Sequence, residues 1–507
     1  MRSRMKKHTA AILLLCLVMV LGGCATKGVV TEQAVLPSPQ PPEAPYNDSR
    51  QDVKQTVLLY LPSAGGEKLV TVPVEAELSV SRHPAEALCR LLYTYPGNEY
   101  AAAFSPDVAL SGVHPVEVSG NTATVILSAG ALRLNHEELF LVCQATANTL
   151  GQLEDIQYVN VLINGVQPGL DLAATQPAGC YQPVAQLETS AQWSRAVSGK
   201  NASRQTISAA VYYPAAGARG IVCEARPLSF GSLEYTDVLQ TLLAALSEGP
   251  EALQGIPRYP DFSLYLSQEP AVVEENGTKR VVLYFDASLN GAIIEHGITR
   301  SVMAASLVYT FTTFIPGVEG VEIHIGDEMI TSLTPTATLT GAGETIVFEN
   351  GLMKRSALSG FLLSGCTLYF AGEDGKLHRV TRMVPCYENR NVRFVIGQLM
   401  KGSQDYDSVE KLQPVLPAGL RDADLIGVSM EGDTLVLHFS ENLMTLCGGM
   451  DETRERNMIY AMVNTLCELP QVKKVRFLIN GQQPQTLAGA LYLPGSFLPN
   501  RDILSAE

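Results

Sequence analysis

Two short motifs place side chains at spacings that enzymes use. Ser408 and Lys411 have the S-x-x-K spacing, in which a lysine can take the proton of a nucleophilic serine. His136 and Glu137 begin like the zinc-binding helix of metalloproteases. No Lys-Thr-Gly follows the first motif, and Phe140 stands where the second zinc ligand would be needed. The sequence therefore favours a surface loop around Ser408 and an acid-rich helix start at His136.

Polar residues also follow the predicted strands at similar places along the chain, namely Ser128, Asp286 and Ser440. A shared catalytic residue would not change type in this way, so we interpret these residues as helix caps or loop starters. The histidines are scattered, and Cys-x-x-Cys, Gly-x-Ser-x-Gly and phosphate-loop motifs are absent from the sequence. We therefore predict no catalytic residue, no metal site and no cofactor, and expect that the protein is not an enzyme.

The N-terminal segment has the order of an export signal. Basic residues precede the stretch 10–21, which is almost wholly apolar. Leu21, Gly22, Gly23 and Cys24 then resemble the lipobox of bacterial lipoproteins, in which small residues admit the peptidase and the thiol accepts the lipid. The apolar run of about a dozen residues is shorter than the roughly 20 that span a membrane. We predict a signal peptide over 1–23, lipidation of Cys24 (palmitate included), and anchoring at the extracytoplasmic face of the cell membrane.

Composition agrees with an anchored, globular chain. Residues 24–53 are rich in proline and poor in large apolar residues, which predicts a tether between the lipid and the folded part. The formal net charge is −15, and removal of the basic signal makes the mature chain more acidic still. This charge argues against nucleic acid as a partner, and it means that the lipid, not surface charge, must hold the protein at the membrane.

An exported protein with an even number of remaining cysteines is able to form disulfides. Three of these cysteines lie on apolar faces of predicted helices and are expected to be small buried hydrophobes: Cys89, Cys143 and Cys467. Cys366 and Cys386 flank a predicted hairpin and are the pair best placed for a disulfide.

Three segments of the chain repeat one pattern: a helix end, a short loop, an alternating strand and a tight turn. Thr149, Thr310 and Thr465 can be set in register. The helix before each threonine keeps apolar residues at i, i+1, i+4, i+5 and i+8, which is one helix face. The strand that follows alternates apolar residues, as in 159–163, and is expected to lay one face on a core.

The parts upstream of each helix also match. Each copy opens with two strands and a helix, followed by a hairpin with a strong turn dipeptide. These dipeptides are Gly120-Asn121, Asn276-Gly277 and Gly432-Asp433. The predicted fold class is α+β, with three tandem β-β-α-β-β-α-β modules whose helices lie on one face of a mixed sheet. We predict modules over 54–180, 206–335 and 360–493, joined by exposed linkers over 181–205 and 336–358.

Packing and turn motifs connect these modules to a known family. They are a helix end with Leu242, Leu243, Gly249 and Pro250, the strand endings VLYFDASL and VLHFSENL, and the finish NTL followed by V-x-FLING in the third copy. Together they resemble the GerMN domain of sporulation and spore germination lipoproteins, in three divergent copies that cover most of 54–493. The resemblance implies the fold and a role in sporulation or germination.

The leading hypothesis is a membrane-anchored envelope lipoprotein that binds proteins or peptidoglycan without catalysing a reaction. The copies keep their buried helix stripe, whereas polar positions differ, as at Asn160 and Arg476, which align. Divergent surfaces on one scaffold suit different contacts by each copy. Two alternatives remain open: a cell-wall hydrolase or hydrolase accessory whose site is assembled across copies, and a lipoprotein that binds a small ligand.

Overall fold

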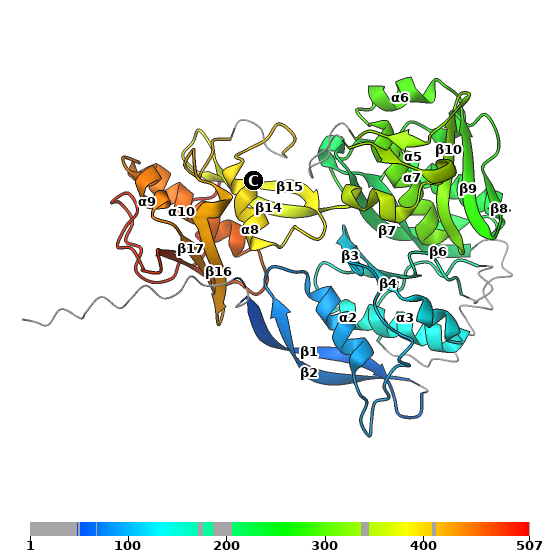
Figure 1. Cartoon of the computed structure of the whole chain (residues 1–507), viewed down its shortest axis with the longest axis horizontal. Helices are drawn as coiled ribbons and strands as arrows, with labels where there is room; N and C mark the ends of the chain where they lie inside the picture. The colour runs from blue at the N-terminus through cyan, green and yellow to red at the C-terminus, as the bar shows by residue number, and fades with distance from the viewer. Residues whose placement is uncertain are drawn as a thin grey trace, which may run out of the picture. The chain divides into compact units, whose positions relative to one another are not determined.

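Each predicted repeat folds into a module that contains the expected β-β-α-β-β-α-β elements in order, and the second and third modules add short elements to them (Figure 1). The computed structural model describes residues 48, 51–66, 68–170, 176–185, 205–335, 344–407 and 412–505. The first module contains β1 (Asp52–Pro62), β2 (Leu69–Ser79), α2 (Pro84–Thr94), β3 (Val116–Ser119), β4 (Thr122–Leu127), α3 (His136–Leu150) and β5 (Tyr158–Ile163). The second contains β6 (Gln205–Pro214), β7 (Ile221–Phe230), α5 (Tyr235–Glu248), β8 (Ala271–Glu275), β9 (Thr278–Phe285), α6 (Leu289–Glu295), α7 (Arg300–Phe314), β10 (Val318–Ile325), β11 (Glu328–Met329), β12 (Ser332–Leu333) and β13 (Ile346–Val347). The third contains β14 (Leu363–Ala371), β15 (Leu377–Pro385), α8 (Val392–Met400), β16 (Leu425–Glu431), β17 (Thr434–Phe439), α9 (Asn442–Cys447), α10 (Glu452–Leu466) and β18 (Lys474–Ile479).

The main strands of each module divide between two sheets, where the sequence analysis expected one, and β12 and β13 of the second module pair in a further two-stranded sheet. The first two strands form an antiparallel ribbon, and the later strands form a mixed sheet in which the final strand runs parallel to its neighbour. The ribbons are β1–β2, β6–β7 and β14–β15, and the mixed sheets are β3-β4-β5, β11-β10-β9-β8 and β16-β17-β18. The fold class is therefore α+β in three modules, with the strands more finely divided than predicted.

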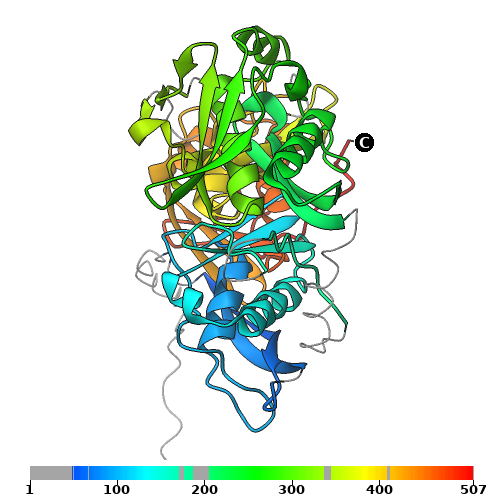
Figure 2. The same ribbon diagram turned by 90° about the vertical axis from the view of Figure 1, so that its right-hand side faces the viewer.

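The long helix of each module lies between the ribbon and the mixed sheet. In the first module α3 contacts β1 on one side and β5 on the other. Figure 1 shows α3 between the β1–β2 ribbon and the sheet that contains β4, and Figure 2 shows the same region turned by 90°. The second module has the same arrangement, with α7 between β6 and β10. Every residue of α7 from Ser301 to Phe314 is buried. The helix is covered on two sides because its sequence is apolar almost all round, which a helix facing solvent would not tolerate.

The repeated threonines hold the ribbon to the helix in all three modules. The hydroxyl oxygen of Thr149 accepts a hydrogen bond from the backbone N–H of Tyr60 at 3.0 Å. Thr310 does the same for Tyr212 at 3.1 Å, and Thr465 does so for Tyr369 at 3.2 Å. The same contact in three places confirms the register that the sequence predicted.

A segment after the final strand closes each module, and the sequence analysis did not predict it. Tyr181 forms an isolated antiparallel bridge with Val159, and Met353 forms the equivalent bridge with Val321. In the third module Phe497 bridges to Val475 in the same way. Val159, Val321 and Val475 occupy the same position of the repeat, so each final strand gains an extended partner from the chain downstream.

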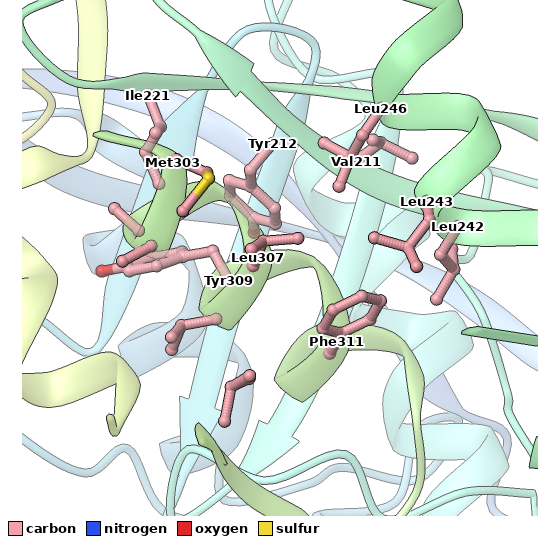
Figure 3. Packing of buried hydrophobic residues seen from close by; sticks show 14 of the residues in the cluster. Val211, Tyr212, Ile221, Leu242, Leu243, Leu246, Met303, Leu307, Tyr309 and Phe311 are labelled. Carbon is pink, nitrogen blue, oxygen red and sulfur yellow. The ribbon is translucent and has the colours of Figure 1, made fainter. Parts of the chain in front are cut away.

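The second predicted linker is wrong over its described part. Phe348, Met353 and Leu358 are at most 4 % exposed, and they belong to the core of the second module. That core contains Val211, Tyr212, Leu242 and other side chains shown in Figure 3. The sequence predicted an exposed linker because the apolar residues of this segment follow neither the period of a helix nor that of a strand. In the structure these side chains enter the core one at a time, from an isolated β-bridge and from short 3-10 turns.

Candidate functional site

Two side chains of the turn between β3 and β4 form hydrogen bonds with backbone groups of the other two modules. The Ser119 hydroxyl accepts the N–H of Cys223 at 3.1 Å and donates to the carbonyl oxygen of Leu363 at 2.5 Å. The Asn121 amide accepts the N–H of Ala225 at 2.9 Å and donates to the carbonyl of the same residue at 3.1 Å. One turn of the first module thus binds β7 of the second module and the start of β14 of the third.

Glycine is required at the tip of this turn. Gly120 has a φ of 58°, and a Cβ built there would lie 1.7 Å from the carbonyl oxygen of Cys223. Gly432 occupies the equivalent turn of the third module with a φ of 64°, and nothing lies within 4 Å of its Cβ position. The two glycines share a conformation, but only Gly120 is pressed against a neighbouring module.

A buried ion pair fixes the first module to the second. Nη2 of Arg355 lies 2.5 Å from Oε2 of Glu117, and the two side chains are 6 % and 10 % exposed. Arg355 also donates to Thr313 at 2.6 Å and to the Tyr212 hydroxyl at 3.2 Å, and its guanidinium carbon lies 3.9 Å from the centre of the Tyr309 ring. A charge desolvated to this degree depends on each of these partners.

A second set of contacts between the first and third modules is more exposed than the bond from Ser119 to Leu363. Oδ2 of Asp155 accepts a hydrogen bond from Arg390 at 2.8 Å and lies 2.9 Å from Nε2 of His83. The Asp155 side chain is 42 % exposed. Nearby, the rings of His114 and Tyr387 stack with centroids 4.2 Å apart. These contacts join the modules at a surface that water reaches.

A groove of about 860 Å³ lies at this junction and is bordered by all three modules. Its walls are strand β1, the start of α2 and the loop after α3 on one side, and strand β14, residues before and on α8 and the loop after α10 on the other. Val222 and Leu253 come from the second module. The groove is the candidate functional site because it is the place where the repeated copies face one another.

The two walls of the groove are equivalent parts of the repeat. Val57 and Cys366 each precede the threonine-bonded tyrosine of their strand by three residues, and both line the groove. Leu153 and Leu469 each follow the repeat threonine by four residues, and they line it as well. The first and third modules therefore present the same face to the same space.

The groove offers surfaces for binding but no assembled proton-transfer or nucleophilic group among its described residues. Nδ1 of His83 accepts the N–H of Ala85 and caps α2, and Nε2 points to Asp155, so both ring nitrogens are engaged. Burial lowers the pKa of His83. Burial would raise the pKa of Asp155, but the hydrogen bond from His83 and the nearby positive charges bring it well below its ordinary value. Burial raises the pKa of the Cys366 thiol to about 12, which keeps it protonated and unreactive.

The structure describes only some of the residues singled out from the sequence. Leu21, Gly22, Gly23, Cys24, the tether up to residue 47 and the Ser408–Lys411 motif lie outside the described residues. His136 begins α3, whose start is held by a capping box between Asn135 and Glu138, as the acid-rich helix start predicted. Asp286 accepts the N–H of Ser288 at a loop start. Within the described parts of the chain, no three His, Cys, Asp or Glu side chains are grouped as metal ligands, and no helix is long and apolar enough to cross a membrane.

The predicted disulfide is also wrong. Cys366 and Cys386 are both free thiols, and they belong to different hydrophobic cores. Cys366 lies in the core of the third module, whereas Cys386 packs into that of the second. Proximity along a hairpin suggested the pair, but the chain leaves β15 toward the neighbouring module before Cys386. The expected burial of Cys89 and Cys143 is confirmed, and Cys467 is partly exposed.

Sequence reasoning missed the residues that join the modules. Ser119, Asn121, Glu117 and Arg355 carry no motif, and Glu117 and Arg355 are 238 residues apart in the chain. The Gly120-Asn121 dipeptide was interpreted only as a hairpin turn. The available signal was that Gly120 is flanked by two side chains that can each donate and accept hydrogen bonds.

Comparisons with known proteins address the family. Residues 58–168 and 367–485 match the family model Germane, described as sporulation and spore germination; these segments lie in the first and third modules. The tandem GerMN domains of the sporulation protein GerM from Bacillus subtilis are 20% identical over 59% of this chain and 99% of theirs, with a TM-score of 0.22. The first GerMN domain of the same protein is 24% identical over 22% of this chain and 84% of its own, with a TM-score of 0.18. No curated protein matches. The GerMN resemblance is confirmed by the family match, and likenesses with TM-scores this low add no further argument.

Proposed function

Because the first and third modules match the family model Germane, described as sporulation and spore germination, we propose that the chain acts in one of these processes as a lipid-anchored binding protein of the cell envelope. In this proposal Cys24 carries the lipid, residues 24–53 span the distance from the membrane, and the three modules contact an envelope protein or peptidoglycan.

The groove between the first and third modules is the observation that carries the binding role. Its apolar lining is aliphatic, as at Val57, Leu88 and Leu469, and its polar lining is largely amide and hydroxyl, as at Gln152 and Asn389. Side chains of these kinds bury apolar surface and fix orientation through hydrogen bonds, which is what a recognition site needs. The engaged ring nitrogens of His83 support binding over catalysis.

Replacement of the gene in the sporulating host tests both parts of the proposal. A null strain is expected to yield fewer heat-resistant spores or to germinate more slowly than the wild type. Cys24→Ala is expected to leave the precursor uncleaved or to remove the protein from the membrane fraction, and to share the null defect. Cys16→Ala is the matched control, because it changes a cysteine within the signal that accepts no lipid.

Each part of the proposal has its own contrary result. A null strain with normal spore counts and normal germination would contradict the role in sporulation or germination. If Cys24→Ala is processed and fractionates like the wild type, the anchor is wrong. Release of fragments from purified peptidoglycan by the full chain, abolished by one side-chain change, would replace binding with hydrolysis.

A further inference from the structure

In each module, the repeated hydrogen bond to threonine shows which backbone N–H groups of the first strand point away from the second strand. The N–H groups of Tyr60, Tyr212 and Tyr369 bond to threonines of the long helix, so they point away from the partner strand of the ribbon. Residues two and four positions earlier have the same direction, because a strand repeats every two residues. These residues form the outer edge of the ribbon.

In the first and second modules this edge is occupied from within the chain. The Gln152 amide accepts the N–H of Leu58 at 3.2 Å and donates to its carbonyl at 2.8 Å, as a paired strand would. In the second module the N–H of Cys180 donates to the carbonyl of Ser208 at 2.8 Å. An extended segment that closes the first module therefore also lies on the edge of β6. Gly179 permits this approach, since a Cβ there would lie 2.5 Å from the Ser208 oxygen.

The same edge in the third module borders the groove. Thr367 takes the place of Leu58, Gly365 takes the place of Ser208, and both line the groove. The Asn389 amide reaches the Gly365 carbonyl oxygen only at 3.5 Å, a long and exposed contact that an added strand would replace. Glu468 takes the place of Gln152, but its carboxylate accepts the hydroxyl of Tyr369 at 2.6 Å. A carboxylate has no N–H to donate, so it cannot cover a strand edge as the Gln152 amide does.

The walls of the groove define what else a bound segment would meet. Glu154 and Glu468 are exposed on opposite loops, and Asp155 is already paired with Arg390. The lining therefore has an excess of negative charge beside aliphatic side chains such as Leu153 and Leu469. A cation on the bound segment would complement the two unmatched carboxylates.

We propose that the outer edge of β14 at Gly365 and Thr367 binds an extended polypeptide segment of a partner protein by strand addition within the groove. The segment has small residues where it crosses Gly365, as Gly179 does on β6, and a Lys or Arg side chain toward Glu154 and Glu468. Main-chain hydrogen bonds supply the pairing, and the aliphatic walls and carboxylates supply the selectivity. This inference rests on the proposed binding function and assigns it a site.

The chain supplies its own probe for this edge. A fluorescein-labelled peptide with the sequence of residues 176–185, carrying Cys180→Ser and two added lysines, is titrated with the full chain in detergent and followed by anisotropy. Saturable binding is expected, and a version with two glutamates in place of the lysines is expected to bind about tenfold more weakly at low salt. Two further peptides carry N-methyl groups on alternate backbone nitrogens, one at the odd-numbered residues and the other at the even-numbered residues. One set of methyl groups is expected to abolish binding and the other to leave it unchanged, because only every second N–H of the bound peptide faces β14.

A pair of threonine variants locates the binding. Thr367→Trp fills the groove edge and is expected to weaken binding about tenfold or more. Thr206→Trp is the matched control, because Thr206 is an exposed residue near the start of the equivalent strand β6 and does not line the groove. Absence of saturable binding, equal effects of both methylation parities, equal affinity of the lysine and glutamate peptides, or equal effects of the two variants would each overturn the proposal. The spore assays do not involve the peptide, so failure here leaves the role in sporulation standing.

Discussion

Strand β6 of the second module and strand β14 of the third hold the same place in the repeat but have different surroundings. From Ala209 to Pro214 every residue of β6 is buried, whereas β14 is exposed at Gly365, partly exposed at Ser364 and Thr367, and borders the groove there. Equivalent threonines of the long helices, Thr310 and Thr465, accept a hydrogen bond from the backbone of each strand. This difference shows that contacts within a module determine its fold. Whether the module can bind a partner depends on whether another part of the chain covers the outer edge of its ribbon.

The second module has become the centre of the packing. It receives the turn at Ser119, the ion pair of Glu117 with Arg355 and the closing segment at Cys180. Its core is apolar enough to bury α7 on all sides. The family match falls on the first and third modules, which keep the more exposed faces. We infer that the middle copy stabilises the assembly and the outer copies form the recognition surface.

The largest expected effect comes from the ion pair at the centre. Arg355→Ala leaves Glu117 nearly buried without a partner, which should lower the free energy of unfolding by about 3–5 kcal/mol. Arg390→Ala removes the partly exposed pair at the groove, in which Asp155 is 42 % exposed and keeps His83 as a partner, and should lower the free energy of unfolding by only about 1 kcal/mol. Urea denaturation followed by circular dichroism measures both. Equal losses would show that the central contacts are no more important than those of the groove.

The hairpin glycines provide the next comparison. Gly120→Ala forces a Cβ against the Cys223 carbonyl in a left-handed conformation and should destabilise the protein by about 2–4 kcal/mol. Gly432→Ala has the same backbone conformation and open space, so it should cost only about 1–2 kcal/mol. Thermal unfolding of the two variants separates backbone strain from the packing between modules. A milder effect at Gly120 than at Gly432 would contradict the docked turn.

The repeated threonines test what the copies share. Thr310→Val and Thr465→Val each leave a tyrosine N–H without its acceptor and should each lower the free energy of unfolding by about 1–3 kcal/mol. Similar losses are expected, because both threonines are at most 2 % exposed and make the same bond. Denaturant titration checks this. A loss at Thr310 alone would mean that the third module does not depend on the repeated contact.

The smallest expected effect is a pH dependence at His83, which lies beside Asp155 of the groove lining. Burial lowers the pKa of His83 in the folded protein, so below about pH 6.5, the ordinary value for histidine, the unfolded state takes up a proton that the folded state resists. Stability should therefore be fully present above pH 6.5 and decline as the pH falls below it. His83→Asn keeps a capping acceptor and removes the titration, so its melting temperature should change less between pH 7 and pH 5. If the melting temperatures of the two proteins fall by the same amount between pH 7 and pH 5, His83 is not the titrating group.

Local sequence patterns predicted most of each copy. The register of Thr149, Thr310 and Thr465 followed from apolar stripes that repeat within a helix, and the turn at Gly120 followed from its dipeptide. These signals are short-range, so they survive in a single sequence. The closing bridge at Val159 was missed because one paired residue such as Tyr181 leaves no period to detect.

The candidate site could not be predicted in the same way. The groove exists because equivalent faces of the first and third modules meet. The sequence around Gly365 or Leu153 contains no pattern that predicts this contact between modules. The pairing of Glu117 with Arg355 likewise arises only when distant segments fold together. A polar residue beside a hairpin turn, such as Asn121, is compatible with solvent or with a docked neighbour, and the packing of whole modules decides between them.

Hydrogen exchange of the full chain, followed by mass spectrometry, tests the comparison of β6 and β14 most directly. The segment 209–213 is buried and contacts α7, so its amides should be among the slowest to exchange. The segment 364–369 borders the groove, and its outer-edge amides at Gly365 and Thr367 should exchange at least about tenfold faster, with slowing on addition of the lysine-tagged peptide. Equal protection of the two segments without peptide would mean that the edge of β14 is already covered, and would contradict the assignment of this edge as the open one.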